Sequence, residues 1–231
     1  MTEPEVLIFD VNETLLDFAA ALEPIFKRIF GVKAEGKRQA WFGMAVHSAF
    51  TAIITKKYCP FGAHAMSAIT MLGQQNGVTV SDEDKEALKE AIHLAPPHPE
   101  VDEALALLKD AGFRLAALTN NAQNVVDMQL KNAGLTQYFE KILSADTIKV
   151  LKPAPEPYEF AAKEMGLSGP AEMRMVAAHC WDCAGAMRAG AKAAFVDRPS
   201  AAWDPLVERT DVVGSDLLEV AKAIVAKRKS T

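Results

Sequence analysis

The feature that most constrains this chain is a short apolar run that ends at an acid. Residues 6–9 are all apolar, and Asp10 follows them directly. A short, unbroken apolar run is typical of a strand that is buried on both faces in a parallel sheet. In open α/β sheets, ligands bind at the carboxyl ends of the strands. The run therefore predicts an α/β protein in which Asp10 lies at the ligand-binding edge.

From residue 97 onward, predicted strands and helices alternate, and glycines at 112, 134 and 190 suit the helix ends. Strands that alternate with helices pair in parallel through right-handed crossovers. The strands are predicted at 114–118, 142–143, 175–178, 193–196 and 211–213. The helices are predicted at 100–111, up to 134, at 155–165, up to 190 and at the C-terminus. This alternation predicts a three-layer, Rossmann-like core around a parallel sheet.

Residues 19–96 interrupt the alternation with helical stretches rich in Ala, Ile, Phe and Met. Ser81 is followed by three acids, which predicts a helix start because Ser caps helices and acids favour their first turn. Prolines at 96, 97 and 99 prevent further helix. We therefore divide the chain into a core of residues 1–18 and 97–231 and an inserted helical cap of residues 19–96.

Polar residues follow several of the predicted strands. Because the carboxyl ends of parallel strands meet at one edge, these side chains are expected to gather there. Burying such groups costs free energy unless they pair with one another or take part in chemistry. We interpret the set as a catalytic site. Its members are Asp10, Thr14, Thr119, Asn120, Lys152, His179 and Asp182.

The composition argues against several other functions. The chain has 25 basic and 30 acidic residues, a net charge of −5, and no basic stripe that could neutralise nucleic-acid phosphates. Its apolar stretches are shorter than the ~20 residues of a membrane span, and its acidic start is not typical of a signal peptide. Three cysteines are too few for a disulfide framework. We expect a cytoplasmic protein that binds neither nucleic acid nor membrane.

Four motifs stand at the predicted strand ends. They are Phe9-Asp10-x-x-x-Thr14-Leu15, Leu118-Thr119-Asn120, Lys152-Pro153 with Tyr158 beyond it, and Trp181-Asp182 followed by Gly185-Ala186. Their combination resembles the haloacid dehalogenase superfamily, and within it the type II, or L-2-haloacid, dehalogenases. The resemblance covers essentially the whole chain, and it implies the same core fold with an inserted cap.

The resemblance also implies a role for individual residues. In the family, the strand-end aspartate, here Asp10, is the nucleophile, and the lysine, here Lys152, holds its charge. The last aspartate, matching Asp182, anchors that lysine. A further group is expected to bind substrate or halide. It comprises Thr14, Thr119, Asn120, Tyr158 and Trp181, together with Phe42 of the cap.

Two positions bear on whether a metal takes part. Phosphatase members hold Mg²⁺ with the nucleophile, a second aspartate two residues later and further acids in the last motif. Here the second position is Asn12, and residues 181–185 contain the single acid Asp182. A divalent ion would have too few anionic ligands, which favours a reaction without metal or other cofactor. A Mg²⁺-dependent phosphatase and a ligand-binding relative without turnover remain as alternatives.

Two residues near the nucleophile depart from the family pattern. Glu13 stands where the family generally has glycine, and His179 where it has asparagine. A carboxylate can fix the tautomer of a histidine so that the other ring nitrogen accepts a proton. We hypothesise that His179, oriented by Glu13, activates the water that cleaves an ester on Asp10. Alternatively, His179 only donates a hydrogen bond, as the amide would, and Glu13 faces solvent or a lysine.

The cap departs from the family pattern as well. The family usually has an arginine directly after a tryptophan early in the cap, where it binds the halide or the substrate carboxylate. The matching residues here are Trp41 and Phe42, with Arg38 one helical turn earlier. If Phe42 replaces the arginine, then Asn120, backbone amides and aromatic edges must capture the halide. Both aromatic residues could equally be core residues of the cap.

Cys180 and Cys183 form a CxxC pattern, which in other proteins serves redox chemistry or metal binding. The resemblance already accounts for the residues between them, and no second cysteine pair exists to complete a zinc site. We interpret both cysteines as small packing residues.

The resemblance implies hydrolysis of the carbon–halogen bond in a small 2-haloalkanoic acid, such as a haloacetate or L-2-halopropionate. Asp10 would displace the halide and form an ester, which water then hydrolyses. The expected partners are therefore the haloacid and the halide. A homodimer formed through apolar cap helices is also expected. The preferred halogen, the chain length and the use of fluoroacetate stay open.

Overall fold

The computed structural model describes residues 5–199 and 201–229. Its centre is a six-stranded sheet in the order β3-β2-β1-β4-β5-β6, in which every pair of neighbouring strands is parallel. The strands are β1 Val6–Phe9, β2 Arg114–Thr119, β3 Lys141–Ser144, β4 Met173–Ala177, β5 Lys192–Val196 and β6 Val212–Gly214. The predicted α/β, Rossmann-like fold with a parallel sheet is confirmed.

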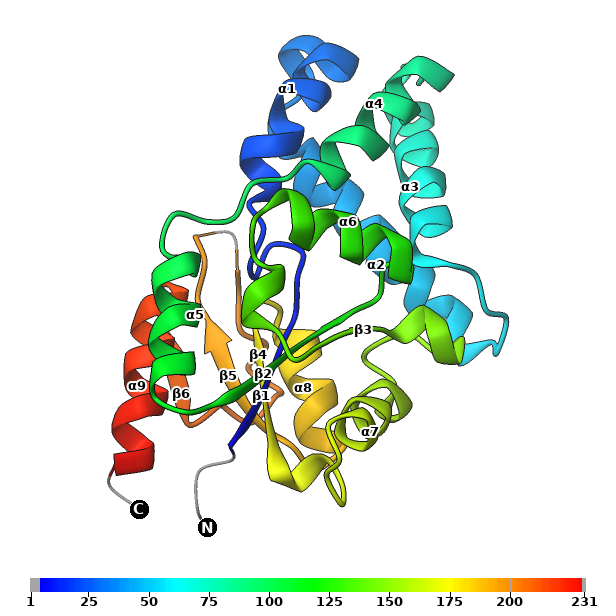
Figure 1. Ribbon diagram of the computed structural model, residues 1–231. Coiled ribbons are helices and arrows are strands. Elements are labelled where there is room, and N and C mark those ends of the chain that lie inside the picture. Colours follow the sequence, from blue (N-terminus) through cyan, green and yellow to red (C-terminus); the bar gives the residue numbers. More distant parts are fainter. Residues whose placement is uncertain (1–4, 200, 230–231) are drawn as a thin grey trace.

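Alternate residues of β1 face two separate hydrophobic cores. Leu7 and Phe9 belong to the core that also contains residues of helices α5 (Val101–Asp110) and α9 (Leu217–Lys229). Val6 and Ile8 belong to a second core, which contains residues of helices α7 (Pro155–Glu164) and α8 (Cys180–Arg188). Helices therefore cover both faces of the sheet, which makes three layers (Figure 1).

The fourth strand differs from its predicted bounds. The sequence pattern predicts residues 175–178, whereas β4 spans Met173–Ala177. The early part of the strand includes the charged residue Arg174, which interrupts the apolar pattern although it is buried. Its guanidinium donates hydrogen bonds of 2.6 Å to Ala193 O and to Asp211 Oδ1, and these contacts satisfy the buried charge.

Four helices lie beyond the carboxyl ends of the strands, at the top of Figure 1. They are α1 Phe18–Phe30, α2 Lys37–Ile54, α3 Phe61–Asn76 and α4 Asp82–His93. The predicted helix start at Ser81 is confirmed, because Ser81 and Asp84 form a reciprocal capping box. The remaining helix is α6 Gln123–Asn132, and short 3₁₀ segments cover Gly31–Lys33, Thr136–Tyr138, Ala145–Ile148 and Pro170–Glu172.

The chain enters and leaves this helical region through two adjacent segments. Leu16 and Pro97 form an isolated antiparallel bridge. The amide of Asp17 donates to Pro96 O at 2.7 Å, and the amide of His98 donates to Leu15 O at 3.0 Å. The division into a core of residues 1–18 and 97–231 and a cap of residues 19–96 stays a prediction, and it places both boundaries at this paired segment.

Candidate functional site

Asp10 lies directly after the central strand β1, in a buried position at the carboxyl edge of the sheet. Its two carboxylate oxygens have different partners. Lys152 Nζ donates to Oδ1 at 2.9 Å, and Thr14 Oγ1 donates to Oδ2 at 2.8 Å. The same Thr14 hydroxyl accepts the Ala178 amide at 3.0 Å. Loops after β1 and β4 therefore fix the orientation of the Asp10 carboxylate.

The Lys152 ammonium is fully buried and has three hydrogen-bond acceptors. Besides Asp10, it donates to Asp182 Oδ2 at 2.6 Å and to Leu118 O at 2.8 Å. Since an ammonium has three donors, this set satisfies it completely. Tyr158 in turn donates to Asp182 Oδ1 at 2.6 Å, so Asp182 is held in place as well.

These contacts control the charge of the Asp10 carboxylate. Burial by itself would raise the pKa of Asp10, but the positive charge of Lys152 and the hydrogen bond from His179 outweigh it and hold that pKa below its ordinary value. Burial would likewise lower the pKa of Lys152, whereas Asp10 and Asp182 raise it above its ordinary value. The pair is therefore a carboxylate and an ammonium at neutral pH.

His179 lies between two carboxylates. Its Nδ1 is 3.2 Å from Asp10 Oδ2, and its Nε2 is 3.3 Å from Glu13 Oε2. The ring is stacked between Phe42 and Trp181, with centroid distances of 5.2 Å on both sides. Burial disfavours the imidazolium, but the hydrogen bonds to Asp10 and Glu13 outweigh burial and raise the pKa of His179 to about 9. His179 is therefore a positively charged imidazolium at neutral pH.

Glu13 has a backbone conformation that is unusual for a residue with a side chain. Its φ is +60°, in the left-handed region that favours glycine. Arg38 of α2 forms an ion pair with the Glu13 carboxylate, and its Nε donates to Glu23 at 3.1 Å. Burial would raise the pKa of Glu13, but His179 and then Arg38 lower it below its ordinary value. Glu13 thus faces His179 and an arginine, not solvent or a lysine.

Thr119 is the last residue of β2 and Asn120 follows it, and both line a small cavity beside Asp10. Asn120 makes two hydrogen bonds to the backbone of Lys152: its Oδ1 accepts the amide at 2.7 Å, and its Nδ2 donates to the carbonyl at 3.1 Å. Thr119 Oγ1 accepts the Asn121 amide at 3.2 Å. Asn120 therefore positions the lysine loop as well as the cavity wall.

The cavity beside Asp10 is small. Its volume is about 10 Å³, which is room for about one water molecule. Phe61, the first residue of α3, is a wall residue that no sequence motif marks. The lining consists of Asp10, Asn12, Phe42, Phe61, Thr119, Asn120, Lys152, His179 and Trp181.

Two predicted substrate contacts are corrected by the structure. Thr14 and Tyr158 are fully buried and do not line the cavity. The hydroxyl of Thr14 donates to Asp10, and that of Tyr158 donates to Asp182. Both hydroxyls are therefore engaged behind the carboxylates, where they position charged groups instead of binding substrate or halide. Asp182 also lies behind the cavity, where its contact with Lys152 fits the anchoring role expected of it.

The family model for haloacid dehalogenase-like hydrolases matches residues 4–190. The chain belongs to this family. That match spans β1, the region of α1 to α4 and the segments that contain Asp10, Lys152 and His179. The haloacid dehalogenase-like fold of the core is therefore established.

Curated relatives of this haloacid dehalogenase-like hydrolase match over most of its length. (S)-2-haloacid dehalogenase 4A of Burkholderia cepacia is 29% identical over 195 residues, which cover 83% of this chain and 82% of the relative. Haloacetate dehalogenase H-2 of Moraxella sp. is 26% identical over 211 residues, which cover 91% of this chain and 93% of the relative.

Solved structures agree on the fold. The L-2-haloacid dehalogenase of Xanthobacter autotrophicus superposes with a TM-score of 0.87 at 22% identity and covers 97% of this chain and 98% of its own. The structure of the same enzyme with chloropropionic acid covalently bound superposes with a TM-score of 0.86 at 22% identity. At this level of identity the likeness establishes the fold.

The haloacid dehalogenase-like site has few groups that could hold a divalent ion. Asn12 Oδ1 accepts hydrogen bonds from Gln129 at 3.2 Å and from Asn121 at 3.4 Å, so this oxygen is already engaged. Both oxygens of Asp10 have donors, one of which is a cationic lysine. Within residues 5–199 and 201–229, no group of three or more His, Cys, Asp or Glu side chains is placed to hold a metal. This donor set does not fit Mg²⁺.

Cys183 of the CxxC pattern has a packing role. Cys183 is buried, and its Sγ lies 3.8 Å from Ala177 O and 3.7 Å from Ala194 O. Burial raises the pKa of the Cys183 thiol well above its ordinary value, so it is not a reactive thiolate. Cys59, Cys180 and Cys183 are all free thiols.

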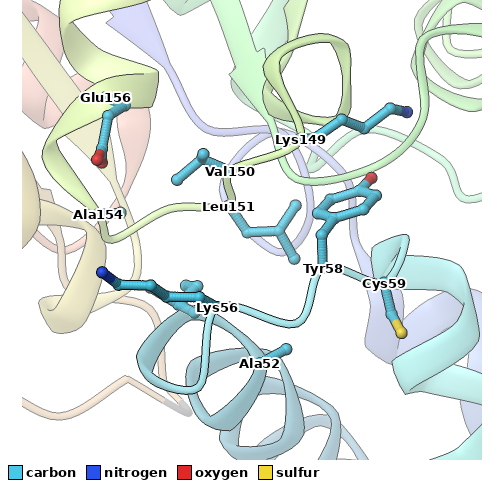
Figure 2. Close-up of a pocket in the computed structure, with 10 residues that line it drawn as sticks. Ala52, Lys56, Tyr58, Cys59, Lys149, Val150, Leu151, Ala154 and Glu156 are labelled. Atoms are coloured by element: carbon cyan, nitrogen blue, oxygen red, sulfur yellow. The ribbon is translucent and has the colours of Figure 1, made fainter.

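A separate cavity of about 310 Å³ lies between the end of α2 and the segment that precedes Lys152. In Figure 2, Lys56 and Tyr58 face Val150 and Leu151 across it. The Tyr58 hydroxyl donates to Asp146, which links this segment to the region before α3. None of the site residues predicted from the sequence lines this cavity.

No helix within the described part of the chain combines the length and the hydropathy that a membrane span requires.

Proposed function

We propose that this protein hydrolyses the carbon–halogen bond of small 2-haloalkanoic acids, such as haloacetates and L-2-halopropionate, through an ester on Asp10 and without a metal. The observation that carries the proposal is the buried Asp10 carboxylate, which is ionised by Lys152 at 2.9 Å and lines a small cavity. The dehalogenase relatives support the choice of substrate class.

The first step is displacement at carbon. The Asp10 carboxylate attacks the carbon that carries the halogen, in line with the carbon–halogen bond, and the halide leaves with inversion. Burial of Asp10 keeps water away from the nucleophile, and its contacts with Lys152 and Thr14 fix its orientation. Both effects lower the barrier to displacement. Phe42 lines the cavity and supplies no charge, so the nearest cations are Lys152 and protonated His179.

The second step is hydrolysis of the ester, and here His179 acts. Esterification removes the negative charge of Asp10, and with it the largest of the contacts that raise the pKa of His179. The pKa of His179 then falls, and the imidazolium releases its proton to solvent. Neutral His179 takes a proton from water through Nδ1 while the hydroxide adds to the Asp10 carboxyl carbon. Collapse releases the 2-hydroxy acid and restores the Asp10 carboxylate and the imidazolium.

Glu13 is a positioning residue in this scheme. Its Oε2 lies 3.3 Å from Nε2 of His179. Nδ1, which faces Asp10, is therefore the ring nitrogen that takes up and releases the proton. Arg38 keeps the Glu13 carboxylate ionised. Both ring nitrogens of His179 have carboxylate partners. This supports a catalytic pair of His179 and Glu13 over the alternative in which His179 only donates a hydrogen bond, as an asparagine amide would.

The experiment that tests the proposed function compares two activities of the purified protein. Halide release from bromoacetate and (S)-2-chloropropionate should persist in excess chelator, and p-nitrophenyl phosphate with Mg²⁺ should give no phosphate. Phosphate release that depends on Mg²⁺ would favour the phosphatase alternative. If neither halide nor phosphate is released, the alternative of a ligand-binding relative without turnover stands.

We propose in addition that the enzyme is a cytoplasmic homodimer. Its three free thiols are compatible with a reducing compartment. The exposed apolar residues Val32 and Ile54 lie in the region of α1 and α2 and offer surface for a second copy. Light scattering at micromolar concentration should give twice the monomer mass of 25.0 kDa. A monomer mass would contradict the dimer.

A further inference from the structure

Helix α2 contacts both members of the Glu13–His179 pair. Arg38 forms an ion pair with the Glu13 carboxylate. The ring of Phe42 stacks on the imidazole of His179 with a centroid distance of 5.2 Å. Arg38 and Phe42 are four residues apart in α2, so they lie on the same face of the helix. This face of α2 therefore completes the surroundings of the group that is expected to activate water.

The nucleophile is held by other segments. Lys152 and Thr14 donate to the two carboxylate oxygens of Asp10 at 2.9 and 2.8 Å, and neither residue belongs to α2. Arg38 does not line the cavity beside Asp10. A change at Arg38 can therefore alter His179 without altering the contacts that orient the nucleophile.

Arg38 supplies a fixed positive charge to the pair. Its side chain is only 4% exposed, and its Nε donates to Glu23 Oε1 at 3.1 Å. A guanidinium does not lose its proton in proteins, whereas an imidazolium can. Glu13 Oε2 is also 3.3 Å from His179 Nε2. One carboxylate therefore lies between a permanent cation and a cation that titrates.

Other charged or titratable side chains surround the pair. They are Asp10, Asp17, Glu23, His98, Lys152, Asp182 and Arg198. Of the basic groups among them, Lys152 and Arg198 pair with other carboxylates, and His98 contacts the backbone carbonyl of Glu13. Within the part of the chain that the structure describes, the cations that contact the Glu13 carboxylate are therefore Arg38 and the imidazolium.

This shared carboxylate matters once Asp10 is esterified, because Glu13 is then the remaining anionic partner of His179. A carboxylate that served His179 alone would hold the imidazolium proton, since a nearby opposite charge favours the charged form. We propose that Arg38 is a positioning residue for ester hydrolysis: it holds Glu13 in place and shares its negative charge, so that His179 gives up its proton once the nucleophile carries the ester. This inference rests on the proposed function. The proton passes to water, and Arg38 neither gains nor loses one.

The test measures the two steps separately in one turnover. Enzyme in excess over bromoacetate is quenched at successive times across a series of pH values. Bromide then reports displacement, and glycolate reports hydrolysis of the ester. In the wild type, hydrolysis should accelerate with pH as His179 becomes neutral. In Arg38→Gln, the midpoint of this rise should shift upward by about one pH unit, which slows hydrolysis at neutral pH about tenfold. Displacement should keep its wild-type rate.

Two further variants keep the test decisive. Arg38→Lys keeps the positive charge and should restore the wild-type midpoint. Arg28→Gln, at a half-exposed arginine of α1, is the control and should change neither step. Hydrolysis that is slowed by the same factor at every pH in both Arg38 variants, with an unchanged midpoint, would mean a purely structural arginine and would overturn the proposal.

Arg38→Lys decides alone if Arg38→Gln does not fold. Hydrolysis at the wild-type rate across the pH series would then support the role of the charge, and a uniform loss would overturn it. No bromide release by the wild type would instead overturn the proposed function.

Discussion

His179 Nδ1 lies 3.2 Å from Oδ2 of Asp10, so the imidazole contacts the same carboxylate that is expected to carry the ester. Glu13 approaches the opposite ring nitrogen at 3.3 Å. The pKa of His179 therefore depends on the charge of Asp10, since esterification of Asp10 removes one of the two anionic neighbours of the imidazole. His179 is therefore expected to be protonated during halide displacement and to act as a base during ester hydrolysis. The two steps can be measured separately.

Replacement of His179 by asparagine should separate ester formation from ester hydrolysis. His179→Asn retains a hydrogen-bond donor but has no basic nitrogen, so Asp10 can still displace the halide. We expect a burst of one halide per active site, followed by turnover reduced at least about 100-fold, the range typical for loss of a general base. Rapid-quench measurement of bromide with excess bromoacetate gives both quantities.

The control for this variant is His47→Asn, which changes an exposed histidine of α2. It should retain full turnover. If His179→Asn releases halide over many turnovers at the wild-type rate, His179 does not activate the water.

Glu13→Gln tests the positioning role of the carboxylate. The amide has the same shape but cannot stabilise the imidazolium, so the pKa of His179 should fall and its tautomer should no longer be fixed. We expect the steady-state rate to fall by about 10- to 100-fold while the halide burst persists. Glu23→Gln, which changes the other partner of Arg38, is the matched control and should keep the wild-type rate. Equal steady-state rates for Glu13→Gln and Glu23→Gln would indicate that Glu13 has no role in ester cleavage.

The protonation of His179 also predicts how stability depends on pH. Its pKa rises on folding from the ordinary value of 6.5 to about 9. The folded protein therefore binds more protons than the unfolded chain in this range, so this contribution is complete below pH 6.5 and is lost as the pH rises through 9. We expect urea unfolding of the wild type to show a decrease in the free energy of unfolding across this range. The decrease should be absent in His179→Asn, and an identical pH profile for both proteins would contradict the assigned charge.

Two arginines of the cap region should differ in their contribution to stability. Arg38 is buried and pairs with both Glu13 and Glu23, whereas Arg28 is half-exposed and pairs with Asp84. Loss of one partner from a buried ion pair costs about 3 kcal/mol or more, and loss of an exposed pair less than about 1 kcal/mol. Arg38→Met should therefore lower the free energy of unfolding far more than Arg28→Met. Equal losses in urea denaturation would show that the Arg38 pairs contribute little.

Much of the core could be predicted from local sequence because its signals are local. A run such as residues 6–9 is apolar because the strand is buried on both faces, and the acid that follows it marks the sheet edge. The approach of His179 to Asp10 follows from the same geometry, since β1 and β4 are paired and their ends meet. Arg174 shows the limit of such patterns. Because it is charged, the apolar pattern placed the start of β4 after it, although the side chain is buried within the strand.

The contacts that involve the cap could not be predicted in the same way. Arg38 and Phe61 meet site residues only because α2 and α3 lie in one particular position over the sheet, and no sequence period encodes that position. The substrate contacts expected of Thr14 and Tyr158 were wrong for a related reason. A hydroxyl near a motif can face a substrate or a neighbouring carboxylate, and packing decides between them.

The most direct test of the account is the fate of oxygen during one turnover. The enzyme, in excess over (S)-2-chloropropionate, reacts in water enriched in ¹⁸O, and mass spectrometry then measures the label in the product and in the peptide that contains Asp10. The account predicts that one ¹⁸O atom enters the Asp10 carboxylate and that the first lactate formed is unlabelled, because its new oxygen comes from the protein. Label in lactate, with an unlabelled Asp10 peptide, would mean that water attacks the substrate directly and would contradict the account.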